Sequence, residues 1–140
     1  MTATPAPPTD SEKKLFKAAK AGDIATVQSL LAAEPALIAT RDGDACTPLH
    51  YAAWKGHPEL AALLLDAGAD ISAHNTNGHW GTTPLHGAAH GNQTAVAALL
   101  IERGADIHAL NPSGRTPLQE TEAHSAKAVA NLLKRHGATH

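Results

Sequence analysis

The 140-residue sequence contains one cysteine, Cys46, and few aromatic residues: one Phe, one Tyr and two Trp. A single cysteine cannot form a disulfide within the chain, and it excludes zinc or iron–sulfur sites built from several cysteines. Alanine and leucine dominate the apolar residues instead. Because small side chains allow helices to approach closely, this composition predicts a core of short, closely packed helices.

The sequence also has no excess of either charge and no long apolar run. Its 11 Lys and Arg residues are scattered among 13 Asp and Glu residues, which gives a formal net charge of -2. This distribution lacks the basic patch that is typical of proteins binding nucleic acids or anionic lipids. No stretch approaches the roughly 18 consecutive apolar residues of a membrane-spanning helix. We therefore expect a soluble cytoplasmic protein with neither nucleic acid nor a membrane as partner. Residues 1–10, with three prolines and no signal-peptide pattern, predict a disordered tail.

The string TPL occurs three times, beginning at residues 47, 83 and 116, so that the copies lie 36 and 33 residues apart. In each copy the threonine suits a helix N-cap and the proline suits the first helical position. Each copy leads into a short alanine-rich or polar helix and then into a second helix with leucines at three- and four-residue spacing. The second helices are expected to end at glycines that favour a left-handed backbone, namely Gly68, Gly104 and Gly137.

A unit of about 33 residues cannot bury its own apolar face, so the units are expected to stack into a solenoid. We expect one domain over residues 11–140, with two full repeats at 42–74 and 75–109. Residues 11–41 keep the helix pair without TPLH and form an N-terminal capping repeat. Residues 110–140 replace the paired alanines with polar residues and form a C-terminal capping repeat.

The segment TPLHYAAWKGHPELAALLLDAGADISAHN resembles a complete ankyrin repeat, through its TPLH, AA, GH, LL and GAD signatures. The resemblance extends over about residues 12–140. It implies an all-α solenoid of helix–turn–helix units joined by β-hairpin-like turns. It also implies a monomeric, non-catalytic scaffold without a cofactor, which binds another protein through the concave surface formed by its turns and first helices.

The resemblance implies that both tryptophans lie at or beside the concave surface, where residues vary among ankyrin repeats. Trp54 follows the paired alanines of a first helix, and Trp80 lies in a turn that the sequence HWG lengthens by three residues. Aromatic anchors with a polar rim are typical of binding surfaces. The alternative is that Trp54 covers the alanines and Trp80 folds back over the gap between repeats. The predicted contact residues are Asp44, Tyr51, Trp54, Lys55, Asn77, His79, Trp80, His90, Arg115 and Glu120.

Ten histidines suggest a metal site as a competing hypothesis. His86 and His90 stand four residues apart on one predicted helix, as zinc ligands often do, and His79 is the nearest candidate for a third ligand. The ankyrin resemblance gives another interpretation, because the histidine of TPLH bonds to turn backbone in that family. We therefore predict no metal, and we keep a metal-responsive module and a structural spacer as alternative functions.

The sequence offers no convincing catalytic site, so we predict that the protein is not an enzyme. Cys46 lacks an evident oxyanion arrangement or third catalytic partner, and an exposed turn thiol is the expected interpretation. The polar residues Glu120, Glu122 and His124 are expected to form a solvated cap on the last repeat.

Overall fold

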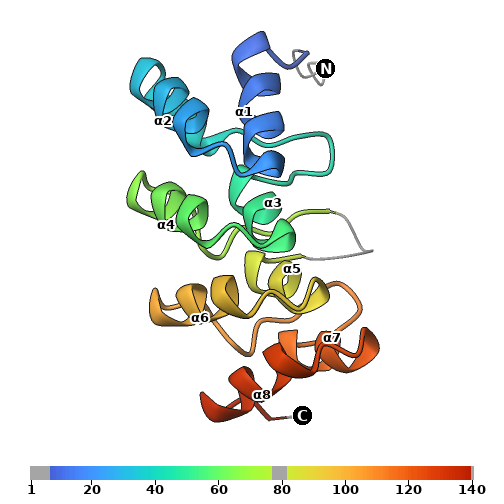
Figure 1. The fold of residues 1–140 in the computed structure, drawn as a ribbon. Helices are drawn as coiled ribbons and strands as arrows, with labels where there is room; N and C mark the ends of the chain where they lie inside the picture. Colours follow the sequence, from blue (N-terminus) through green and yellow to red (C-terminus); the bar gives the residue numbers. More distant parts are fainter. Residues whose placement is uncertain (1–6, 77–81, 140) are drawn as a thin grey trace, which may run out of the picture.

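The computed structural model describes residues 7–76 and 82–139, and these residues form a stack of four helix pairs (Figure 1). The first helices of the pairs lie in one layer and the second helices in another (Figure 1). The first helices are α1 (Asp10–Ala21), α3 (Pro48–Lys55), α5 (Pro84–His90) and α7 (Pro117–Ala123). The second helices are α2 (Ile24–Ala33), α4 (Pro58–Asp66), α6 (Thr94–Glu102) and α8 (Lys127–Arg135), and a short 3₁₀ helix, η1 (Pro35–Ala39), follows α2.

The helices begin and end where local chemistry predicts. The hydroxyl groups of Thr47, Thr83 and Thr116 accept hydrogen bonds from backbone N–H groups in the first turns of α3, α5 and α7. These bonds satisfy donors that a helix start leaves without an intrahelical partner. The second helices α4 and α6 are followed by Gly68 and Gly104, which adopt φ angles of 102° and 94°, a conformation that glycine takes without steric penalty.

The first helix begins earlier than the sequence suggested. Helix α1 starts at Asp10, inside the stretch expected to be a tail, because Thr9 and Glu12 form a reciprocal capping box. The Thr9 hydroxyl accepts from the Glu12 N–H at 3.2 Å, and the Glu12 carboxylate accepts from the Thr9 N–H at 3.2 Å. Residues 1–6 lie outside the described residues.

The core runs through the stack without interruption. Helix α3 packs against α1 on one side and α5 on the other, and α5 packs in turn against α7. The paired alanines of α3 and α5 are fully buried at these contacts, which lets the helices approach closely. Both layers supply larger core residues: Leu15, Leu49, Leu85 and Leu118 from the first helices, and Leu60, Leu64, Val96, Leu100, Val129 and Leu133 from the second helices.

Hairpin-like turns connect the repeats, although the described residues form no β-strand. In each turn a backbone N–H crosses to a carbonyl on the other side: Asp42 to Cys46 at 3.0 Å, Asn75 to Thr82 at 2.8 Å and Asn111 to Arg115 at 2.9 Å. The predicted all-α solenoid with hairpin-like turns is therefore confirmed. Among the described helices, none is long and apolar enough to cross a bilayer.

Cys46 is buried, and the expectation of an exposed turn thiol was wrong. Its side chain points into the stack and its sulfur accepts a hydrogen bond from Asn75 Nδ2 at 3.3 Å. Burial, reinforced by the nearby Asp42 carboxylate, raises the pKa of this thiol to about 11. Cys46 is thus a protonated core residue at neutral pH and not a nucleophile.

Candidate protein-binding groove

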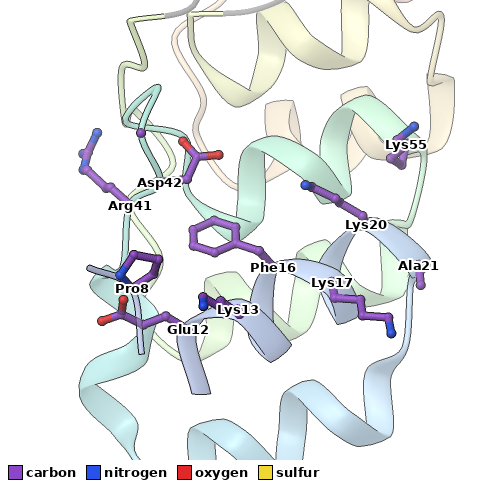
Figure 2. A pocket seen from close by; sticks show the side chains of 11 residues that line it. Pro8, Glu12, Lys13, Phe16, Lys17, Lys20, Ala21, Arg41, Asp42 and Lys55 are labelled. Carbon is purple, nitrogen blue, oxygen red and sulfur yellow. The ribbon is translucent and has the colours of Figure 1, made fainter. Parts of the chain in front are cut away.

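A groove of about 950 Å³ opens on the side of the stack formed by the first helices and the turns. It lies between α1, the turn before α3 and the end of α3 (Figure 2). Its lining consists of Pro8, Glu12, Lys13, Phe16, Lys17, Lys20, Ala21, Arg41, Asp42, Gly43 and Lys55. We call this feature the N-terminal groove.

Phe16 supplies the apolar centre of the N-terminal groove. Its ring is half-buried and points into the groove in Figure 2. The ring packs edge-on against Tyr51, with 5.8 Å between the ring centroids and 84° between the ring planes. The Tyr51 hydroxyl donates a hydrogen bond to the Asp42 carboxylate. This chain of contacts fixes Phe16 and joins α1, α3 and the turn that precedes α3.

Lysines surround this apolar centre. Lys20 lies over the Tyr51 ring, with Nζ 4.7 Å from the centroid, and Lys55 lies over the Trp54 ring at 4.3 Å. Such cation–π contacts hold the ammonium groups near the groove without removing them from solvent. Lys13 and Lys17 add two more exposed ammonium groups. The groove carries five cationic and two acidic side chains, although the whole chain has a net charge of -2.

Arg41 has a structural role at the edge of the N-terminal groove. Its Nη1 donates to the carbonyl oxygens of Ala45 at 3.1 Å and His74 at 2.9 Å. The same two turns are joined by the Thr76 N–H, which donates to the Asp44 carbonyl at 2.7 Å. These bonds tie the turns of two successive repeats together beside the groove.

The structure separates the predicted contact residues into exposed and buried groups. Lys55 is exposed and lines the N-terminal groove, while Trp54 is half-buried against the core beside it. Asp44 and Arg115 are exposed in their turns. Tyr51 is only 9% exposed, because it packs against Phe16 and bonds to Asp42, so it supports the groove from beneath.

Three other predicted contacts, Asn77, His79 and Trp80, lie outside the described residues. The two remaining ones, His90 and Glu120, meet at the opposite end of the stack. Glu120 is only 7% exposed, because α7 turns it toward α5 and the preceding turn. The expected solvated cap therefore does not include Glu120, and its burial removes it from the surface available to a protein partner.

Among the residues that line the groove, the sequence predicted only Lys55 as a contact. The charged and aromatic lining residues that it missed are Glu12, Lys13, Phe16, Lys17, Lys20, Arg41 and Asp42. Lys13, Lys17 and Lys20 recur at three- and four-residue spacing. This spacing is also typical of the solvated face of a capping helix, so by itself it does not indicate a binding surface. The signal that distinguishes the two interpretations is Phe16, the only phenylalanine, placed among these lysines.

The histidines of the TPLH strings are structural. His86 lies within hydrogen-bond distance of the Thr83 hydroxyl through Nδ1, at 2.7 Å, and of the Arg115 carbonyl through Nε2, at 3.0 Å. Both ring nitrogens are thus engaged, and His86 cannot pair with His90 as a metal ligand. His90 instead faces His124, with 4.0 Å between the ring centroids. Burial, together with the neighbouring His124, lowers the pKa of His90.

Stacked helix pairs with hairpin-like turns along one edge define a class of protein, the solenoids built from short helix–turn–helix repeats. The comparison with family models identifies the member of that class. A model of ankyrin repeats in three copies matches residues 5–75, and a second model of ankyrin repeats matches residues 72–120. The chain belongs to the ankyrin-repeat family, whose repeats generally mediate protein–protein interaction.

Curated relatives match about half of the chain. A probable E3 ubiquitin-protein ligase, XBOS33 of Oryza sativa subsp. japonica, is 38% identical over 50% of this chain and 16% of its own length. Ankyrin repeat domain-containing protein 49 of Bos taurus is 42% identical over 46% of this chain and 27% of its own length. The serine/threonine-protein kinase VIK of Arabidopsis thaliana is 32% identical over 53% of this chain and 19% of its own length. The chain thus matches less than a third of each of these relatives.

Proposed function

We propose that this protein is a non-catalytic binding module that holds a segment of another protein in the N-terminal groove. The observation that carries this proposal is the placement of a half-buried Phe16 among four exposed lysines, on the surface formed by turns and first helices. Lys13, Lys17, Lys20 and Lys55 would contact the partner. Trp54, Asp44 and Arg115 extend the proposed surface, and Asn77, His79 and Trp80 remain predicted contacts.

The lining of the N-terminal groove indicates the chemistry of the bound segment. Exposed ammonium groups favour carboxylates, and the local excess of positive charge would steer an acidic segment toward the groove. The exposed part of Phe16 favours an apolar side chain, which gains by leaving water. We therefore propose that the partner segment carries several Asp or Glu residues around at least one large apolar residue.

The experiment is a selection from a displayed peptide library followed by affinity measurements. We expect the selected peptides to be acidic with a central apolar residue, and their affinity to fall as salt is raised from about 0.1 M to about 1 M. The double variant Lys17→Glu/Lys55→Glu should weaken binding at least about tenfold, which corresponds to about 1.4 kcal/mol. Light scattering on the same samples checks the expected monomer.

The matched control is Lys134→Glu/Arg135→Glu, which makes the same charge change at two exposed positions of α8. This control should bind the selected peptides with nearly unchanged affinity, and circular dichroism should give the same helix content for both variants. Equal affinity of the wild type and the groove variant would refute the proposed site and favour the spacer function.

A further inference from the structure

Three potential metal ligands meet near the C-terminal end of the stack, far from the N-terminal groove. His90 is the last residue of α5, Glu120 lies in α7, and His124 caps the end of α7. Each offers one ligand atom, and these three atoms all lie within 4.8 Å of one another. The rings of His90 and His124 face each other with a 54° tilt. Two consecutive repeats therefore contribute to one cluster of two imidazoles and a carboxylate.

The carboxylate of this cluster is buried and held in place. The Glu120 side chain is only 9% exposed. Its Oε1 lies 3.1 Å from His124 Nε2, and its Oε2 accepts a hydrogen bond from Asn111 Nδ2 at 3.1 Å. A carboxylate out of water needs a positive partner, and an imidazole supplies one only when it is protonated. A divalent cation would supply that charge while both imidazoles stay neutral, which is the form in which histidine coordinates a metal.

His90 has unused ligand capacity. Its Nδ1 atom is buried and has no hydrogen-bond partner among the described residues. Such an atom has lost water without gaining a replacement, which is unfavourable for stability. A cation bound at this cluster would give His90 a partner, because rotation of the ring would turn one of its nitrogen atoms toward the ion. His124 is about a third exposed, so an ion has access to the cluster from solvent.

We propose that His90, Glu120 and His124 bind one Zn²⁺ ion and thereby link the third repeat to the fourth. Two imidazoles and one carboxylate form a ligand set that zinc accepts, with water in the fourth position. Ligand atoms in tetrahedral sites with bonds of 2.0–2.1 Å lie about 3.3 Å apart, so the 3.1 Å between Glu120 and His124 already fits. The His90 ring would move closer on binding. Asn111 would orient the carboxylate from behind.

Zinc binding at this place would stabilise the end of the solenoid. The last repeat packs against a neighbour on one side only, and the ion would add a bond between α5 and α7. A ligand that binds only the folded state raises the melting temperature as its concentration increases. Zinc is therefore expected to protect the C-terminal repeat.

The test uses the full chain, freed of metal by a chelator and titrated with ZnCl₂ in a calorimeter. We expect one Zn²⁺ per chain, a melting temperature that rises with zinc, and the visible absorption of four-coordinate Co²⁺ when cobalt replaces zinc. Glu120→Gln keeps the size of the side chain, and His124→Gln changes a partly exposed position, so both variants should stay folded. Each should lower the zinc affinity at least about tenfold and abolish the cobalt signal.

The matched control is His108→Gln/His136→Gln, which removes two exposed histidines outside the cluster. This control should bind zinc as the wild type does. The proposal is overturned if no saturable one-to-one binding occurs, if both cluster variants keep the wild-type affinity, or if the control variant loses the binding. Circular dichroism of each apo variant distinguishes a lost ligand from a lost fold.

Discussion

The buried histidines of the TPLH strings connect each repeat to the next. His50 Nδ1 accepts a hydrogen bond from the Thr47 N–H at 3.0 Å, so its Nε2 carries the proton. That Nε2–H donates to the Thr82 carbonyl, 2.9 Å away, in the following repeat. The last repeat has Gln119 in the equivalent position, and its Oε1 accepts from the Thr116 N–H at 2.9 Å. Glutamine keeps the cap but does not reach a further repeat.

This comparison yields a prediction for His50→Gln. The variant should preserve the cap of α3 and lose the bond to Thr82, whose carbonyl still accepts from the Asn75 N–H. We therefore expect the free energy of unfolding to fall by about 0.5–1.5 kcal/mol, the net contribution of one hydrogen bond. Urea denaturation at pH 7.5 measures this loss, and an unchanged midpoint and slope would mean that the inter-repeat bond adds nothing to stability.

The same histidines predict how stability depends on pH. Burial lowers the pKa of both His50 and His86 from the ordinary value of 6.5. The unfolded chain therefore takes up protons at a higher pH than the folded chain, so this part of the stability is present above pH 6.5 and is lost as the pH falls below it. Denaturation curves between pH 8 and pH 5 should show this loss, and His50→Gln should reduce it. An equal pH dependence in both proteins would contradict the assignment.

At the scale of helices, a close approach between α3 and the end of α5 restricts Gly91. A Cβ atom at this position would lie 2.6 Å from the Trp54 carbonyl oxygen and 3.2 Å from Gln93 Cγ. The same carbonyl accepts a hydrogen bond from Gln93 Nε2 at 3.1 Å. Only a residue without a side chain lets these two repeats stay in contact here.

We predict that Gly91→Ala destabilises the protein by about 1–3 kcal/mol, because the added methyl group pushes the backbone of α3 away. The matched control is Gly43→Ala, where a Cβ would meet nothing within 4 Å. Neither glycine has a positive φ, so the comparison tests packing and not backbone strain. The control should be neutral or stabilising by up to about 1 kcal/mol. Thermal unfolding of both variants measures the change in stability, and an equal loss of stability in the two variants would contradict the steric explanation.

At the scale of the whole molecule, the solenoid has two kinds of repeat. The central helices α3 to α6 have neighbours on both sides, whereas α1 and α2 at one end, and α7 and α8 at the other, have neighbours on one side. Stability in such arrays is approximately the sum of the repeats and their nearest-neighbour contacts. The end repeats should therefore open at lower free energy than the centre.

Hydrogen exchange followed by mass spectrometry tests this gradient. We predict the slowest exchange in α3 to α6 and faster exchange in the terminal repeats. The metal-free chain gives the reference, since added zinc is proposed to slow the exchange of α7. Uniform exchange along the chain would show instead that all four repeats open together.

The sequence by itself predicted the elements and their order, because their signals are local. Thr47, Thr83 and Thr116 each act on backbone groups within their own helix, and the glycines act within their own turns. The spacing of the leucines then identifies the buried face of each second helix. The recurrence of these signals every 33 to 36 residues was enough to predict a stacked solenoid.

Only the tertiary structure decided which residues share a site. The N-terminal groove joins Phe16 on α1 with Asp42 in a turn and Lys55 on α3, and the proposed zinc site joins His90 with Glu120 and His124. Cys46 and Glu120 looked exposed by their place in the repeat, yet both are buried by neighbouring segments. These outcomes depend on how one repeat is placed on the next. That placement follows from side-chain packing between residues distant in sequence, which no local pattern encodes.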